Sequence, residues 1–348
     1  MENAVRHKRT GDEMIADIKV LVLGCGSIGR RHLNNLKALG IREFILCDPS
    51  GEALERASVG LSDPVLANDL SSALKARPGA AIVCTPSSMH LENAIELVKS
   101  GVHVLIEKPL SNELAGCDDL QKAAGENGVV AMMAMCYRFH PVLLRVKELI
   151  SSKAVGGVFH ANYFGGHYLP DWHPHADYRR EYAARRSLGG GVVLTSIHGL
   201  DNIRWLFGEV EELSAFVDKV SALEMDVEDL ALGLFKTKNG VYVNWQTDFL
   251  QRANQHRLVI AGTDGTIRCD VIEGTIEIFR AGRSGWSSER VLFETNTMYM
   301  KEMKHFLECI ERKERPSIDL KDGIKTLKLA LEVKEKGSMR EVKECLTA

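Results

Sequence analysis

A glycine-rich turn near the start of the chain has the spacing that holds the phosphates of a dinucleotide. Gly24, Gly26 and Gly29 follow an apolar run and precede a helical pattern. The first glycine permits a tight turn, the second lets the backbone approach a pyrophosphate, and the third lets the helix pack on the strand. Backbone amides at the helix start, among them those of Ser27 and Ile28, present the positive end of the helix dipole to the phosphates. This spacing predicts a dinucleotide-binding site.

An acidic residue stands where the ribose of such a dinucleotide would be bound. Asp48 ends the second predicted strand, nineteen residues beyond Gly29. A carboxylate there accepts hydrogen bonds from both ribose hydroxyls and repels the 2′-phosphate of NADP, so the sequence favours NAD. Arg30, Arg31 or Ser50 could still assist a phosphate, which leaves NADP as the weaker alternative.

The elements that position these residues alternate between strands and helices from Asp17 to about Met135. The strand candidates lack the polar and apolar alternation of a half-exposed sheet, so we expect both faces to be covered. They are Ile18–Leu23, Phe44–Cys47, Val65–Ala67, Ala80–Cys84, Val102–Ile106 and Val129–Met135, with helical patterns at 28–39, 90–100 and 113–126. This alternation predicts a doubly wound Rossmann sheet in an α/β protein.

After about Phe139, strands follow one another without helices between them, which predicts a large, open, mainly antiparallel sheet. They are Val158–Phe164, Glu212–Val220, Leu230–Phe235, Val241–Thr247, Arg257–Ala261, Thr266–Cys269 and Thr275–Arg280. Further helices are expected at 141–151, 192–207, 300–312 and 321–336. We therefore divide the chain into a tail (1–16), an NAD-binding Rossmann domain (17–138) and a C-terminal α/β domain (139–348), whose last helices could pack back on the first domain.

The composition excludes several classes of function. The formal net charge of −3 provides no basic field for nucleic acid or for an anionic membrane. No stretch approaches the ~20 apolar residues that span a bilayer, and the polar residues 1–16 lack the apolar segment of a signal peptide. The eight cysteines form no Cys-x-x-Cys pair, which favours a reducing compartment. We expect a cytoplasmic protein without a nucleic-acid or membrane partner.

Further motifs follow the strands of the first domain and continue into the second. They are Thr85-Pro86-Ser87-Ser88-Met89-His90, Glu107-Lys108-Pro109, Tyr137-Arg138-Phe139-His140-Pro141, Gly189–Gly191, His198, Asp201 and Trp205-Leu206-Phe207-Gly208. Together with the glycine turn, this set resembles the Gfo/Idh/MocA family, the glucose–fructose oxidoreductase and inositol dehydrogenase group, over nearly the whole chain from Asp17 onward. The stretch at 168–174 is similar to members from surface-polysaccharide and acidic-sugar pathways.

The resemblance implies roles for residues at the cofactor and the substrate. Thr85, Pro86 and His90 would lie along the dinucleotide, and Glu107 would lie near the nicotinamide ribose. Lys108 would reach the reacting hydroxyl beside the nicotinamide. The open C-terminal sheet would carry the substrate and assemble the chain into a homodimer or homotetramer.

Lys108 and His198 are the residues expected to handle the proton of a hydride transfer. Burial and a neighbouring positively charged nicotinamide should lower the pKa of Lys108 toward neutrality. Asp201, on the same helix face as His198, would orient the imidazole or remain a surface carboxylate. Many family members carry a carboxylate one turn before this histidine, whereas this chain has Leu194 and Thr195, and a threonine hydroxyl is no base at neutral pH.

A loop at 167–186 is rich in aromatic, histidine and arginine residues. Such residues stack on sugars and bind carboxylates or phosphates, which would suit an acidic or nucleotide-linked sugar, although the arginines could instead pair with Glu181 and its neighbours. A metal site from His167, His173 and His175 matches no ligand spacing, so no metal is expected. The predicted substrate contacts are Arg138, Tyr168, Trp172, His173, Tyr178, Arg179, Thr195, His198 and Asp201.

The leading hypothesis is an NAD-dependent oxidoreductase that acts on a secondary hydroxyl of a sugar or sugar derivative. One alternative keeps the cofactor bound and uses transient oxidation for a redox-neutral epimerisation, hydrolysis or elimination. Another is a non-catalytic dinucleotide sensor, which the missing carboxylate near Thr195 favours and which Lys108 and His198 oppose. Net NADH formation would separate the first two.

Overall fold

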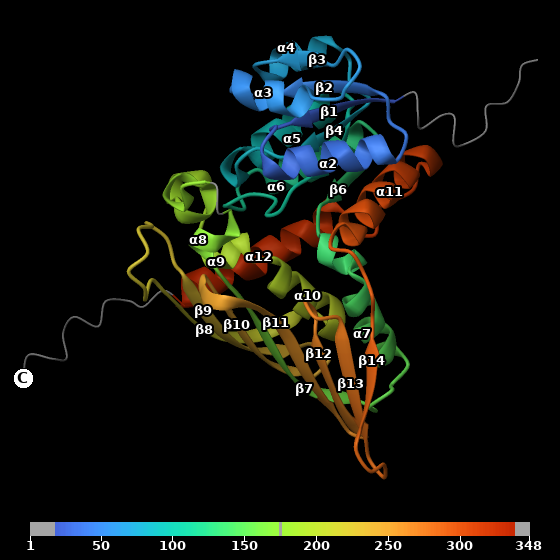
Figure 1. Cartoon of the computed structure of the whole chain (residues 1–348), viewed down its shortest axis with the longest axis vertical. Helices are drawn as coiled ribbons and strands as arrows, with labels where there is room; N and C mark the ends of the chain where they lie inside the picture. Colours follow the sequence, from blue (N-terminus) through green and yellow to red (C-terminus); the bar gives the residue numbers. More distant parts are fainter. Residues whose placement is uncertain (1–17, 174–175, 338–348) are drawn as a thin grey trace, which may run out of the picture.

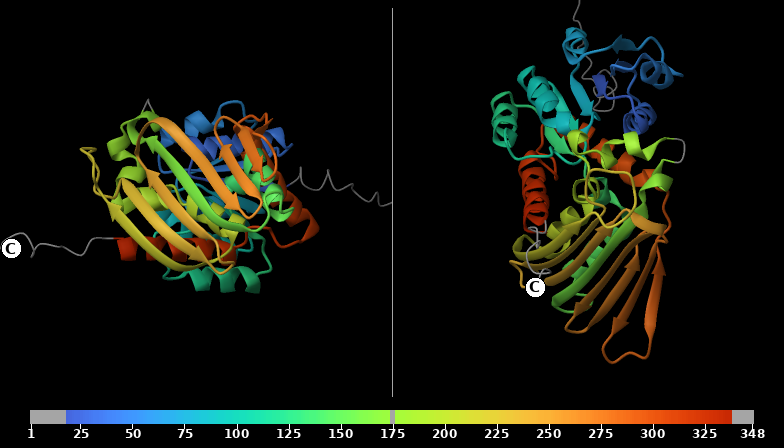
Figure 2. Two further views of the ribbon diagram at one scale, coloured as in Figure 1. Left: turned by 90° about the horizontal axis from the view of Figure 1, so that it is seen from below. Right: turned by 90° about the vertical axis from the view of Figure 1, so that its left-hand side faces the viewer.

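Two β-sheets, one above the other in Figure 1, form the framework of the molecule. The computed structural model describes residues 18–173 and 176–337. The predicted tail (1–16) and His175 therefore lie outside the described residues. Helices cover both faces of the upper sheet, whereas they cover only one face of the lower sheet (Figures 1 and 2).

The upper sheet has six parallel strands in the order β3-β2-β1-β4-β5-β6, which confirms the predicted doubly wound topology. The strands are β1 (Lys19–Leu23), β2 (Glu43–Cys47), β3 (Val65–Ala67), β4 (Ala80–Val83), β5 (His103–Ile106) and β6 (Ala131–Met133). The helices are α2 (Ser27–Ala38), α3 (Gly51–Ser58), α4 (Leu70–Lys75), α5 (His90–Lys99) and α6 (Cys117–Glu126). Val20 and Leu21 point to opposite faces of β1 and are both 0% exposed, so the continuous apolar runs reflect a sheet covered on both sides.

The lower sheet has eight strands in the order β14-β13-β12-β11-β7-β10-β9-β8. Among the described strands of this lower sheet, only β7 and β10 pair in parallel, which agrees with a mainly antiparallel sheet. The strands are β7 (Val158–Tyr168), β8 (Val210–Asp218), β9 (Leu230–Thr237), β10 (Tyr242–Asp248), β11 (Leu250–Gly262), β12 (Gly265–Asp270), β13 (Thr275–Arg280) and β14 (Trp286–Arg290). The helices of this half are α7 (Pro141–Ser151), α8 (Leu169–Trp172), α9 (Val192–Thr195), α10 (His198–Phe207), α11 (Asn296–Arg312) and α12 (Leu320–Gly337).

The sequence prediction differs from the structure in several elements of this half, including β11, which begins at Leu250 rather than Arg257, and the unpredicted helix α8. Strand β7 continues to Tyr168 because Gly165 and Gly166 pair with both β10 and β11, although glycine weakens a strand by itself. Strand β14 was not predicted, since its Trp-Ser-Ser-Glu-Arg sequence is mostly polar. The helix expected at 192–207 is divided into α9 and α10, with Ser196 and Ile197 between them.

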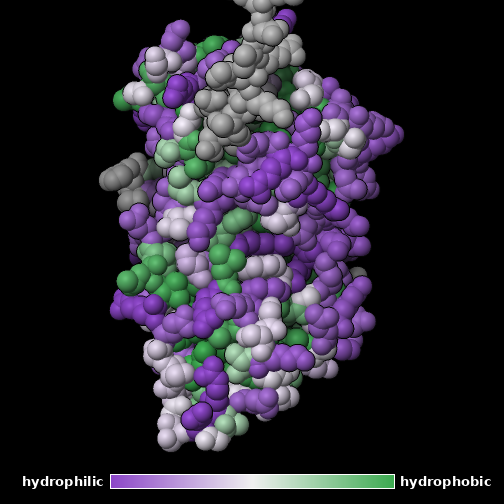
Figure 3. Space-filling model, turned by 90° about the vertical axis from the view of Figure 1, so that its right-hand side faces the viewer, coloured by the Kyte–Doolittle hydropathy of each residue, from purple (hydrophilic) through white to green (hydrophobic). Residues whose placement is uncertain are grey.

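The last two helices pack back on the Rossmann sheet, as the sequence allowed. Met303 and Phe306 of α11 are 0% exposed and belong to the same apolar core as Val20 and Leu105. Figure 1 shows α11 beside α2 and α12 passing between the two sheets. The side of the molecule that carries α11 and β14 has a mainly hydrophilic surface (Figure 3). The C-terminal helices therefore connect the two halves of the chain.

A buried ionic network fixes α10 to α12 and to the turn at 136–139. Arg138 donates two hydrogen bonds to Asp201, at 2.8 and 2.7 Å, and its guanidinium lies 2.6 Å from Asp322. Arg204 pairs with the same Asp322 at 2.9 Å and with Glu209 at 2.8 Å. Because each buried charge faces an opposite charge with good geometry, the network offsets much of the cost of desolvation.

One buried acid in α11 stands outside this network. Glu302 is 0% exposed, and neither of its side-chain oxygens has a hydrogen-bond partner among the described residues. Burial, together with the nearby Glu107 carboxylate, raises the pKa of Glu302 well above its usual value. The folded protein therefore holds Glu302 in its neutral form at a pH where the unfolded chain has ionised it.

This difference predicts that Glu302→Gln stabilises the protein at neutral pH. As the pH rises above about 4.5, the unfolded state loses the Glu302 proton and the folded state keeps it, so the stability of the wild type falls by up to about 1.4 kcal/mol per pH unit. In urea unfolding, the difference in the free energy of unfolding between Glu302→Gln and the wild type should increase from pH 5 to pH 8. The exposed Glu126→Gln is the control. If this difference in free energy does not change with pH, Glu302 is not neutral in the folded protein.

Candidate active site

The glycine turn has the shape that a dinucleotide phosphate requires. Gly24 has φ +95°, and its amide donates to the Cys47 carbonyl at 2.8 Å. An added Cβ at Gly26 would meet nothing within 4 Å, whereas one at Gly29 would lie 1.9 Å from the Gly24 carbonyl oxygen. The middle glycine therefore leaves open space at the start of α2, and the third lets the helix pack against the turn. These residues fit the diphosphate of NAD.

Asp48 lies at the carboxyl end of β2, beside this turn. Its two oxygens accept hydrogen bonds from the amides of Cys25, at 2.8 Å, and Ser50, at 2.9 Å. A carboxylate has about four acceptor positions, so both oxygens retain capacity for ribose hydroxyls. Thr85 and Pro86 are partly exposed and follow β4, and the Thr85 amide would lie 2.9 Å from a Cβ added at Gly24. The turn, Asp48 and the end of β4 thus form one edge of the Rossmann sheet.

His90 and Glu107, which were predicted to contact the cofactor, are both buried and bound to groups of the protein, and their contact with the cofactor stays a prediction. The His90 ring nitrogens lie 2.7 Å from the Pro109 carbonyl oxygen and 2.8 Å from the Thr85 carbonyl oxygen, so His90 ties together the segments after β4 and β5. Glu107 is buried and lies 2.7 Å from Nε2 of His32. That partner lowers the pKa of Glu107 against the opposing effect of burial.

Lys108, directly after β5, contacts residues of the C-terminal half. Its Nζ donates to the Thr195 carbonyl at 2.9 Å and lies 3.5 Å from the Tyr182 hydroxyl. The carbonyl of Thr195 is available because α9 ends there, and the amide of Gly199 donates instead to Ser196. The break between α9 and α10 therefore provides the acceptor that orients Lys108.

The protein groups around Lys108 do not by themselves lower its pKa, and the fall expected beside a nicotinamide stays a prediction. Burial lowers this pKa, but the Tyr182 oxygen and the Glu107 carboxylate outweigh it, so the pKa of Lys108 is raised. His198 behaves in the opposite way, because burial and the positive charge of Lys108 lower its pKa to about 3. Lys108 is therefore charged, and the neighbouring His198 is neutral.

Asp201 and Arg138, which were predicted to contact the substrate, bind each other inside the protein, and their contact with a substrate stays a prediction. The two hydrogen bonds between them, and one from Thr326 to Asp201 at 3.1 Å, occupy the carboxylate inside the protein. Asp201 does not orient His198, whose Nδ1 has no partner among the described residues. The Nε2 of His198 lies 4.0 Å from the Cys136 sulfur.

Tyr182 and His167, two residues that sequence reasoning did not select as site residues, lie near Lys108, and Trp172 lies beside both of them. The Trp172 ring is 40% exposed, and its centroid lies 5.1 Å from that of His167 and 6.3 Å from that of Tyr182. Burial and Lys108 lower the pKa of His167 to about 4, and its Nε2 has no partner within residues 18–173 and 176–337. Tyr182 lies 74 residues from Lys108, so no local pattern could have linked them.

Three other residues of the loop, Tyr168, Tyr178 and Arg179, have partners in the protein. Tyr178 accepts a hydrogen bond from the Glu224 amide at 3.1 Å, and Arg179 pairs with Asp177 at 2.8 Å and Glu224 at 3.3 Å. Arg252 stacks over Tyr168, with 3.5 Å to the ring centroid. The sequence left open whether the arginines of this loop bind a substrate or pair within the protein. Arg179 pairs within the protein, and its partners are Asp177 and Glu224 rather than Glu181.

No group of histidine, cysteine or acidic residues in the described part of the chain could hold a metal ion. His173 stacks on Trp172 with ring centroids 4.8 Å apart, and its Nδ1 lies 3.2 Å from Glu181.

In the part of the chain that the structure describes, no helix has the length and hydrophobicity needed to cross a membrane.

Comparisons with known proteins agree with this geometry. Myo-inositol 2-dehydrogenase of Thermotoga maritima is 26% identical over 332 residues, which cover 91% of this chain and 96% of the relative. A 2,7-anhydro-N-acetylneuraminate hydratase of Escherichia coli is 26% identical over 204 residues, 55% of this chain and 51% of the relative. The structure of levoglucosan dehydrogenase with NADH and levoglucosan has the same fold, with a TM-score of 0.81 at 19% identity over 92% of this chain and 97% of that one.

Two models of one family match the two halves of the chain. The model of the oxidoreductase family with an NAD-binding Rossmann fold matches residues 18–135, and the model of the GFO/IDH/MocA C-terminal domain matches residues 143–268. These matches cover the upper sheet and the lower sheet from β7 into β12, and they agree with the motifs that first indicated the resemblance. The chain belongs to the Gfo/Idh/MocA family of oxidoreductases, whose first domain is an NAD-binding Rossmann fold.

Proposed function

We propose that the protein transfers a hydride between NAD and a secondary hydroxyl of a sugar or sugar derivative in the cleft around Lys108. The observation that carries this proposal is the contact of Lys108, on the dinucleotide side, with Tyr182 and Thr195 on the other side. Buried polar atoms without partners, Oγ1 of Thr195 and Nε2 of His167, belong to residues beside Lys108. Such atoms are suited to bind the hydroxyls of a substrate.

Lys108 and His198 are proposed to handle the proton of this reaction. NAD, when bound, supplies the hydride acceptor. The Lys108 ammonium donates a hydrogen bond to the reacting oxygen and can give it a proton when a ketone is reduced. When the alcohol is oxidised, its proton passes to His198, which is neutral because of its low pKa. The Tyr182 hydroxyl, 3.5 Å from Nζ of Lys108, can take part in the same proton transfer. This chain has Thr195 near the position where many family members carry a carboxylate.

The ring of the sugar is proposed to stack on Trp172, the exposed aromatic side chain beside His167 and Tyr182. Arg179 is engaged with carboxylates, and Arg186 donates to the carbonyl of Asp226. Because these cations already have partners, we favour an uncharged sugar or polyol over the acidic sugar that the loop composition indicated. A relative named as an anhydroneuraminate hydratase supports the redox-neutral alternative.

The outer face of the C-terminal sheet is proposed to join two copies of the chain. Phe216, Leu234 and Tyr242 are 65%, 60% and 57% exposed, and Leu232 lies among them on the same face. Figure 2 shows this face of the sheet uncovered by helices. Exposed apolar patches of this kind mark protein interfaces.

The first test of the proposed function is a screen for NADH fluorescence with uncharged sugars and polyols. With any substrate found, Lys108→Ala should cut turnover about a hundredfold while the dissociation constant of NADH changes less than about twofold, because a positioned proton donor or acceptor contributes to rate rather than to cofactor affinity. Lys99→Ala, at an exposed helix end, is the matched control. Near-normal turnover by Lys108→Ala would rule out its role, and turnover of substrate without net NADH would favour the redox-neutral reaction.

Asp48→Ser should narrow the preference for NAD over NADP. Serine removes the charge that repels a 2′-phosphate and leaves one hydroxyl at the end of β2. The measurement is the ratio of dissociation constants for NADH and NADPH, with the exposed Asp119→Ser as control. A ratio equal to that of the wild type would show that Asp48 does not contact the ribose.

Leu234→Glu should convert the assembled protein into monomers, because a charge in the centre of an apolar interface is costly to desolvate. Light scattering after size-exclusion chromatography measures the mass. Leu292→Glu, at an apolar residue that is 85% exposed and lies outside the sheet, should leave the mass unchanged. A wild-type monomer, or a Leu234→Glu protein of unchanged mass, would exclude this face as the interface.

A further inference from the structure

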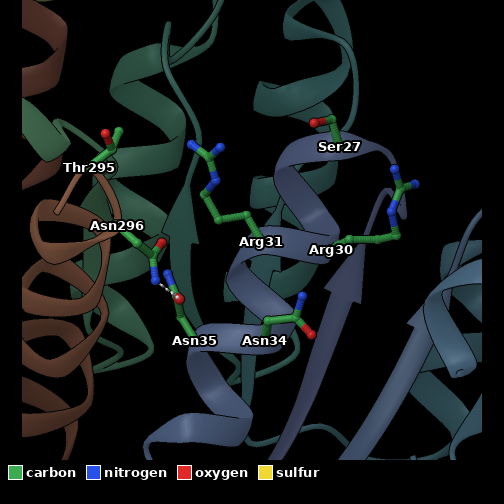
Figure 4. Close-up of a pocket in the computed structure, with 7 residues that line it drawn as sticks. All are labelled: Ser27, Arg30, Arg31, Asn34, Asn35, Thr295 and Asn296. Carbon is green, nitrogen blue, oxygen red and sulfur yellow. Dashed lines mark hydrogen bonds between the residues drawn. The ribbon is translucent and has the colours of Figure 1, made fainter. Parts of the chain in front are cut away.

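A groove runs along α2 from the glycine turn to the start of α11. Figure 4 shows its walls, with Ser27 at the end nearest the turn and Asn296 facing Asn35 across the other end. Arg30 and Arg31 lie between them, and no lining residue is acidic. The groove is thus a positively charged extension of the site where the cofactor diphosphate is expected.

Arg31 is fixed in this groove but lacks an acceptor. Its guanidinium stacks over the Tyr299 ring of α11, with 4.6 Å to the centroid. Within the part of the chain that the structure describes, no carboxylate or other acceptor binds it. Stacking orients the plane of the guanidinium and leaves its in-plane N–H groups available to donate, which is the geometry that suits phosphate. Arg30, in contrast, donates to the Cys25 carbonyl at 3.1 Å.

Asn35 supplies a second, independent sign of a polar ligand. The residue is 2% exposed, and its Oδ1 accepts a hydrogen bond from the Asn296 side chain at 2.7 Å. Its Nδ2 has no partner among the described residues, although it lines the groove. A buried donor without an acceptor is rare in folded proteins, and a ligand or ordered water in the groove would satisfy it.

The N-termini of α2 and α11 add partial positive charge to this groove. Both α2 and α11 begin without a side-chain cap, so the first amides of each helix lack such a partner. One helix begins at Ser27 and the other at Asn296, at the two ends of the groove. Helix N-termini carry partial positive charge, which favours an anion between them.

We propose that this groove is the second wall of the cofactor's diphosphate site, and that Arg31, oriented by Tyr299, donates to a phosphate oxygen. The inference rests on NAD binding at the glycine turn and adds a contribution from the C-terminal helix. The bound dinucleotide would then contact α2 directly and α11 through the Tyr299–Arg31 stack. The two halves of the chain would both contribute to cofactor affinity.

Arg31→Gln in the full-length chain tests this role. At fixed ionic strength, the variant should bind NADH and ADP-ribose about tenfold more weakly, the loss expected for one hydrogen bond to a charged group. Adenosine, which has no phosphate, should bind as it does to the wild type. Arg42→Gln, at another exposed arginine of the same domain, should bind all three ligands normally.

Two results would overturn the proposal. One is an NADH dissociation constant for Arg31→Gln within about twofold of the wild type. The other is binding of inorganic pyrophosphate to wild-type protein already saturated with NADH, which would make the groove a separate anion site. Failure of the wild type itself to bind NADH would instead refute the cofactor assignment, so the two failures are distinguishable.

Discussion

The contact between Lys108 and the carbonyl of Thr195 is the constraint on which the rest of the site depends. It joins the end of a Rossmann strand to the end of α9, and it exists only because the helix stops at Thr195. A continuous helix would have used that carbonyl for its own hydrogen bond. The apparent irregularity between α9 and α10 therefore brings the lysine, Tyr182 and His198 into one cleft.

The halves of the molecule are held in this arrangement by charge as well as by apolar packing. Ion pairs among Arg138, Asp201, Arg204 and the partly exposed Asp322 connect the turn at 136–139 with α10 and α12. The position of His198 on α10 then follows from a network that does not touch its imidazole. Asp201 orients the helix rather than the ring, and α11 adds an apolar contact with the Rossmann core through Phe306.

Lys108 carries the positive charge among Lys108, His167 and His198. Burial keeps His167 and His198 neutral, with pKa values of about 4 and 3, whereas Tyr182 and Glu107 favour the charged form of Lys108. Neutral imidazoles accept protons or hydrogen bonds without adding repulsion beside the ammonium. Arg179 of the neighbouring loop pairs with Asp177 and Glu224, and Trp172 is an exposed aromatic side chain of the same loop.

The sequence by itself determined the glycine turn, Asp48 and the order of the Rossmann strands, because each depends on residues close together in the chain. Fully apolar runs indicate a sheet that is buried on both faces, and the spacing of glycines indicates a turn. Only the tertiary structure decided the partners of Asp201, Glu107 and Lys108, which come from 63, 75 and 74 residues away. A charged residue looks the same in sequence whether it faces a substrate or a buried partner, since its role depends on what the fold places opposite it.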